Sequence, residues 1–145
     1  MTKIVIFGTF DRLHKGHISF LSQAKNLGDY LIAVVARDKY VKSAKGGLPL
    51  ENEKLRIQNL RKINLADKVI LGSRAHNFYQ TLRTYKPVII ALGYDQKPKI
   101  WDLKSDLKRH RLSSIKIVRL KPYKPAIYKS SKMTFYRGIF HSKIK

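Results

Sequence analysis

The chain contains no cysteine, a single tryptophan, and only nine acidic residues against 31 lysines and arginines. Without cysteine it forms no disulfide bonds and no thiolate metal sites, and this absence fits a reducing compartment. No apolar run approaches the length of a membrane span, and no charged segment followed by a long apolar run opens the chain. We therefore expect a cytoplasmic protein without membrane association.

The charge balance is strongly basic, with a formal net charge of +22. No acidic residue follows Asp106, whereas twelve lysines or arginines do. Such a field attracts polyanions, which include nucleic acid and nucleoside triphosphates, although basic side chains also serve solubility. The basic residues are scattered and lack the interleaved aromatics of single-strand binders. We expect weak, salt-sensitive polyanion binding, and an RNA-binding protein stays open as a second class of function.

Apolar runs alternate with segments of helical spacing along the whole chain, and 43% of the residues are hydrophobic. This alternation predicts parallel crossovers and an α/β fold, a Rossmann-like doubly wound five-stranded parallel sheet in a single domain, residues 1–145. The segment from Arg37 to Leu50, which contains Lys39 and the Gly46-Gly47 pair, is expected to be a loop. Strands are predicted at Lys3–Phe7, Tyr30–Ala36, Lys68–Leu71, Val88–Leu92 and Ile115–Leu120, and helices at Gly16–Asn26, Asn52–Ile63, Ala75–Tyr85, Ile100–Arg111 and Ser131–Phe140.

The most informative segment runs from Gly8 to His17, G-T-F-D-R-L-H-K-G-H, between the first strand and the first helix. A helix N-terminus offers free N–H groups and the positive end of a dipole, and Gly16 lets an anion approach the backbone closely. A metal site is the alternative for His14 and His17. Zinc needs three or four ligands, and the other histidines, His76, His110 and His141, form no ligand-like pair. The pattern favours a phosphate site, and ligands of such folds bind at the carboxyl ends of the strands.

This segment resembles the G-T-F-D-x-x-H-x-G-H signature of the cytidylyltransferase-like nucleotidyltransferases. Lys129-Ser130-Ser131-Lys132-Met133 resembles their second signature, which opens the final helix. The segments Ala91–Gln96, Val34–Asp38 and Pro122–Pro125 are similar to archaeal-type FAD synthases. Relatives also place a Glu and an Arg close together near 51–56, where Lys54 or Arg56 would supply the basic group.

The resemblance implies transfer of AMP from ATP to FMN, which gives FAD and pyrophosphate. A cytidylyltransferase that uses CTP and glycerol 3-phosphate, or another phosphorylated precursor, is the alternative within the same class. Mg²⁺ is expected to arrive with the triphosphate, without a metal site made by the protein. A homodimer is the default expectation, because dimers are the commonest oligomers.

The resemblance also implies roles for individual residues. His14, His17 and Lys132 are expected to be catalytic, and Lys42 and Lys45 to meet the acceptor phosphate, although solvated loop lysines are the alternative for these two. Asp11 is expected to cap local N–H groups, and Asp95 suits either the nucleotide or a helix cap. Tyr123 borders the base or simply packs. The full nucleotide-binding set is Thr9, Phe10, His14, Lys15, Gly16, His17, Asp95, Tyr123, Ser130 and Ser131.

Overall fold

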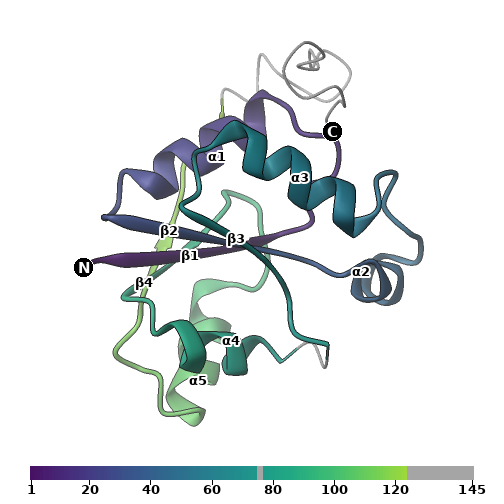
Figure 1. Ribbon diagram of the computed structural model, residues 1–145. Helices are drawn as coiled ribbons and strands as arrows, with labels where there is room; N and C mark the ends of the chain where they lie inside the picture. The colour runs from purple at the N-terminus through teal and green to yellow at the C-terminus, as the bar shows by residue number, and fades with distance from the viewer. Residues whose placement is uncertain (75–76, 124–145) are drawn as a thin grey trace.

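Five parallel strands form one sheet in the computed structural model, which describes residues 1–74 and 77–123 (Figure 1). The spatial order is β3-β2-β1-β4-β5, so the direction of winding reverses between β1 and β4. The predicted α/β architecture with a five-stranded parallel sheet is confirmed. The strands are β1 (Lys3–Gly8), β2 (Tyr30–Val35), β3 (Lys68–Leu71), β4 (Ile89–Leu92) and β5 (Lys116–Arg119).

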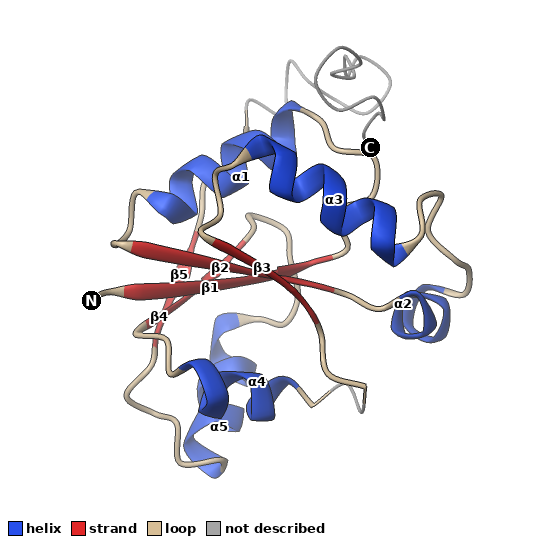
Figure 2. Ribbon diagram, viewed as in Figure 1, coloured by secondary structure: helices blue, strands red, loops and turns tan. Residues whose placement is uncertain are grey.

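Helices cover both faces of the sheet (Figure 2). α1 and α3 pack on one face and α4 and α5 on the other, whereas α2 lies beside the carboxyl ends of the strands (Figures 1 and 2). This arrangement follows from the parallel crossovers, each of which returns the chain over one face. The helices are α1 (Lys15–Lys25), α2 (Asp38–Lys45), α3 (Glu53–Ile63), α4 (Phe78–Tyr85) and α5 (Ile100–Arg109). None of these described helices is long and apolar enough to cross a membrane.

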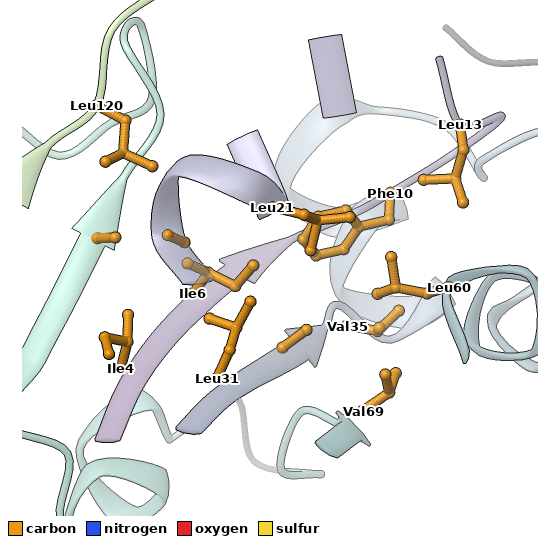
Figure 3. Packing of buried hydrophobic residues seen from close by; sticks show 13 residues of the cluster. Ile4, Ile6, Phe10, Leu13, Leu21, Leu31, Val35, Leu60, Val69 and Leu120 are labelled. Atoms are coloured by element: carbon orange, nitrogen blue, oxygen red, sulfur yellow. The ribbon is translucent and has the colours of Figure 1, made fainter. Parts of the chain in front are cut away.

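Two hydrophobic cores lie on the two faces, and the strands supply both because successive side chains alternate. In β1, Ile4 and Ile6 join the core under α1 and α3, and Val5 joins the core under α4 and α5. Figure 3 shows the first core, in which Leu21 of α1 and Leu60 of α3 meet the sheet. Burial on both faces explains why the strands are continuous apolar runs.

The segment 37–50 contains a helix where a loop was expected, so that prediction is wrong. α2 is short and mostly polar, with Val41 as its only buried residue. Asp38 stands in its first turn, and Gly46 ends it in the left-handed conformation with φ of 81°. One of the two glycines that suggested a loop is therefore the helix C-cap.

Other boundaries shift for local reasons. α4 begins at Phe78 because the side chain of Asn77 accepts from the Gln80 N–H. α5 ends at Arg109, and Arg111 adopts a left-handed φ of 59°. The expected last helix, Ser131–Phe140, lies outside the described residues.

Asp67 links β2 to β3 at the amino ends of the strands. Its carboxylate accepts from Lys25 and from the Leu31 N–H. These contacts lower the pKa of Asp67, so its carboxylate stays charged.

Candidate active site

A cleft of about 1160 Å³ opens at the carboxyl ends of β1 and β4, where the strand order reverses. Ligands of open α/β sheets bind at this switch point. Four segments line the cleft: the first motif from Phe7 to Phe20, the end of α2 with the following loop, the loop after β4, and the chain after β5. The histidine motif therefore faces the place where the topology alone predicts a ligand.

The two motif histidines cap α1 reciprocally. His14 Nδ1 accepts from the Gly16 N–H at 2.9 Å, and His17 Nδ1 accepts from the His14 N–H at 3.2 Å. Their rings are stacked, with centroids 4.1 Å apart. Since each Nδ1 accepts a hydrogen bond, the hydrogen of each neutral imidazole resides on Nε2. The capping geometry thus fixes both side chains as Nε2–H donors in the wall of the cleft.

The helix behind these histidines provides a positive field. No acidic residue stands in the first turn of α1. The partial charge of the exposed N–H groups is therefore not offset locally, and an anion at this position is stabilised. This charge pattern agrees with a phosphate site beside the two histidines.

Phe10 shapes the floor of the cleft. Its side chain is buried and its backbone is left-handed, with φ of 55°. A Cβ added at Gly8 would come within 2.9 Å of the Phe10 ring, so Gly8 is required for this packing. The ring in turn contacts His17, at 5.9 Å between centroids. Gly8 and Phe10 of the motif therefore help to hold the His17 ring in position.

Asp11 anchors a distant loop. Its carboxylate accepts from the N–H groups of Leu50 and Glu51, at 2.8 and 3.0 Å. The structural role predicted for Asp11 is confirmed, but the expectation of a local cap is wrong, because these groups lie 39 and 40 residues away in sequence. The Glu51 side chain in turn accepts a hydrogen bond from the Arg12 N–H at 2.9 Å. The motif and the chain before α3 are thereby held together.

Arg56 is the basic residue that joins these segments, and Lys54 is not. The Arg56 side chain is 0% exposed and donates to the Glu51 carbonyl, the Thr9 carbonyl and Asp38 Oδ1. The three distances are 2.9, 2.7 and 2.6 Å. A buried guanidinium with this many partners holds the first motif, the start of α2 and the start of α3 in one arrangement.

Arg119 organises the opposite wall, and the sequence patterns did not single it out. It lies at the end of β5 and donates to three carbonyls of the loop after β4: Gly93 at 2.8 Å, Gln96 at 2.5 Å and Pro98 at 3.2 Å. Gln96 adds a link to β1, since its Nε2 donates to the Phe7 carbonyl at 2.7 Å. Arg119 carries no motif signal, because it is one of 31 basic residues.

The structure brings most of the predicted site residues together. Lys45 donates to Thr9 Oγ1 at 3.1 Å, which places one expected acceptor lysine beside the first motif. Asp95 is exposed in the loop after β4, and it does not cap α5, whose N-cap is Lys99. The predicted residues that line the cleft are Thr9, Phe10, His14, Gly16, His17, Lys45, Asp95 and Tyr123.

The remaining predicted residues lie elsewhere. Lys15 and Lys42 are not part of the cleft lining. Ser130, Ser131 and Lys132 lie outside the described residues. A second, smaller hollow of about 580 Å³ is bordered by Arg37, Lys54 and Arg74 among others, and it contains none of the motif residues. The chemistry of the motif therefore belongs to the larger cleft.

Comparison with known proteins agrees with this geometry. The model of the family described as cytidylyltransferase-like matches residues 5–134. An FAD synthase of Thermococcus sibiricus is 37% identical over 132 residues, which cover 90% of this chain and 88% of that protein. An FAD synthase of Archaeoglobus profundus is 40% identical over 131 residues, covering 90% of this chain and 82% of that protein.

Two solved structures share the fold of this chain. A protein from Thermoplasma volcanium, described as a lipopolysaccharide core biosynthesis protein, superposes with a TM-score of 0.80 at 37% identity and covers 86% of this chain and 99% of its own. A pantoate–β-alanine ligase from Francisella tularensis shares the fold, with a TM-score of 0.61 at 17% identity. The expected resemblance to nucleotidyltransferases and to archaeal FAD synthases is confirmed, and the chain belongs to the cytidylyltransferase-like family.

Proposed function

We propose that the chain is an FMN adenylyltransferase, an FAD synthase. A phosphate oxygen of FMN attacks the α-phosphorus of ATP and forms the new P–O bond of FAD. The bond between the α-phosphorus and its bridging oxygen breaks, and pyrophosphate leaves with the electron pair. The observation that carries this proposal is the pair of Nε2–H donors, His14 and His17, at the N-terminus of α1 in the wall of the cleft.

The reaction requires no nucleophile from the protein, so the protein accelerates it by positioning the substrates and stabilising charge. The two Nε2–H groups donate to phosphate oxygens, and their partners Gly16 N–H and His14 N–H hold the rings in place. The field of α1 favours the charge that builds on the leaving oxygen. Because the donors are fixed before the substrate binds, little reorganisation is needed during the reaction.

In this proposal the two substrates occupy opposite sides of the cleft. Lys45, which donates to Thr9 Oγ1, is the residue proposed to meet the phosphate of FMN. The loop after β4, with Tyr94 and Asp95, borders the other side and suits the nucleoside of ATP. In this proposal Lys132, Ser130 and Ser131 hold the β- and γ-phosphates. Their role rests on the second motif alone.

Mg²⁺ fits this site through the substrate. In the described part of the chain, no three His, Cys, Asp or Glu residues cluster in a way that could hold a metal ion. Asp11 is the acidic residue within the motif, and both of its oxygens already accept backbone N–H groups. In this proposal a magnesium ion would be held by phosphate oxygens and water, and it would neutralise part of the triphosphate charge. A homodimer and cytoplasmic residence stay predictions.

The test is a substrate panel with purified protein. FMN and glycerol 3-phosphate are each incubated with ATP or CTP in the presence of Mg²⁺, and products are separated by chromatography. FAD formation from FMN and ATP should be fastest, and a faster reaction of CTP with glycerol 3-phosphate would replace the proposal by the cytidylyltransferase alternative.

Substitution of the histidines tests the mechanism. His14→Ala and His17→Ala should each lower kcat by roughly a hundredfold, the loss typical of one transition-state donor. Lys62→Ala, which removes an exposed basic side chain of α3 outside the cleft lining, is the matched control and should retain activity. Wild-type rates in both histidine variants would overturn the assigned roles.

A further inference from the structure

The segment between Lys45 and Leu50 is fastened to the first motif at both ends. Lys45 donates to Thr9 Oγ1 at 3.1 Å, and the Leu50 N–H donates to Asp11 at 2.8 Å. The four residues between these contacts, Gly46-Gly47-Leu48-Pro49, are here named the acceptor arm. Three of them, Gly47, Leu48 and Pro49, line the cleft. The arm therefore forms a held edge of the cleft beside the place proposed for the acceptor phosphate.

The arm presents an exposed apolar side chain to the cleft. Leu48 is 64% exposed although it lines the cleft, and Val41, which also lines it, is buried beneath. An exposed leucine at a cleft edge gains stability when a ligand covers it. Leu50 is similarly exposed, at 69%, but does not line the cleft. Leu48 and Leu50 are therefore almost equally exposed, but only Leu48 lines the cleft.

Nothing in the described part of the fold requires a glycine at position 47. A Cβ at this position would meet nothing within 4 Å, and its φ lies outside the left-handed region. Gly46, by contrast, needs its glycine for a φ of +81°. In addition, no backbone hydrogen bond joins the Gly47 or Leu48 N–H to another described residue. A small residue with free donors suits the close approach of a planar ligand that has polar edges.

We infer that the acceptor arm binds the flavin ring of FMN, with Leu48 packed against the ring face. This inference rests on the proposed function and adds the part of the site that selects the acceptor. The ring system is flat and largely apolar on its faces, and its carbonyl oxygens can accept from the arm's N–H groups. Lys45 at the start of the arm meets the phosphate of the same molecule. The cleft volume, about 1160 Å³, exceeds the roughly 300–1,000 Å³ typical of a single small-molecule site and leaves room for two substrates.

The arm therefore distinguishes acceptors by the ring. A phosphate that carries no ring, such as glycerol 3-phosphate, makes the contact with Lys45 and forgoes the contact with Leu48. Loss of the Leu48 side chain should thus weaken the binding of FMN and leave the binding of ring-free phosphates unchanged. The same substitution should not alter ATP binding, because the nucleoside is proposed to lie against the loop after β4.

The experiment measures FMN binding by equilibrium dialysis for the wild type, Leu48→Ser and Leu50→Ser. Leu48→Ser should weaken FMN binding roughly five- to tenfold, as expected for loss of one leucine contact, and Leu50→Ser by less than twofold. Both variants remove an exposed leucine, so their thermal midpoints and ATP affinities should match the wild type. Gly47→Ala gives a second measure, since it should weaken FMN binding without lowering thermal stability.

The outcomes separate this inference from the proposed function. Equal FMN binding in Leu48→Ser and wild type, or equal losses in both leucine variants, would overturn the arm as the ring site even if the wild type makes FAD. A wild type that neither binds FMN nor converts it would overturn the proposed function and this inference together.

Discussion

The two walls of the cleft are held in different ways. The wall formed by the first motif and the start of α3 depends on a network around the buried Arg56, in which Arg56, Glu51 and Asp11 connect the motif, the start of α2, the chain before α3 and α3 itself. The wall formed by the loop after β4 depends on Arg119, whose guanidinium is only partly buried, and on Gln96. The first wall is part of the folded core, whereas the second is a loop with a local clamp.

This difference predicts how each wall fails. Damage to this network should lower the free energy of unfolding, because the Arg56 guanidinium at its centre is fully buried. Damage to the clamp should leave the fold intact and disorder one side of the site. Stability measurements and substrate-specific kinetics can therefore tell the two walls apart.

The largest effect is expected for Arg56→Met, which removes a guanidinium that is 0% exposed from its three acceptors. Breaking a buried ion pair by removing one partner typically costs about 3–5 kcal/mol of unfolding free energy. Urea denaturation monitored by circular dichroism measures this loss. Lys54→Met, two residues earlier in α3, is the control and should stay within about 0.5 kcal/mol of the wild type. Equal losses in the two variants would contradict the role of the network.

An intermediate effect is expected for Arg119→Ala. With its donor removed, the loop after β4 loses three carbonyl contacts, and the KM for ATP should rise roughly tenfold while the KM for FMN changes little. Arg119→Lys keeps the charge but lacks the forked donors, so it should restore the KM only in part. The split between the two KM values is the measurement that matters. Parallel changes for both substrates would mean that Arg119 does not serve one wall selectively.

The smallest effect is expected for Gly46→Ala at the start of the acceptor arm. Gly46 caps α2 with φ of +81°, and alanine there should cost about 1 kcal/mol of unfolding free energy. Thermal melts compared with those of Gly47→Ala check this, because Gly47 lacks both the strained φ and close neighbours. If the two variants lose equal stability, the arm is not held in the way described.

Much of this protein could be predicted from local sequence. The apolar runs gave the five strands, because burial on both faces of a parallel sheet requires continuous apolar residues. The glycine-flanked pair His14 and His17 indicated a phosphate site, because a strand, a tight turn and a helix start are all local features. His14, His17 and Thr9, which all belong to this one segment, line the cleft.

Only the tertiary structure decided which residues hold the site in shape. Asp11 caps groups 39 and 40 residues away, Arg56 reaches Thr9 across 47 residues, and Arg119 reaches Gly93 across 26. α2 is a helix because the fold buries Val41 and lets Gly46 cap it, although the local sequence is polar and glycine-rich. A pattern in the chain reports neighbours along the sequence. The partners of a buried arginine or a capping aspartate are chosen by chain segments that meet only when the sheet has formed.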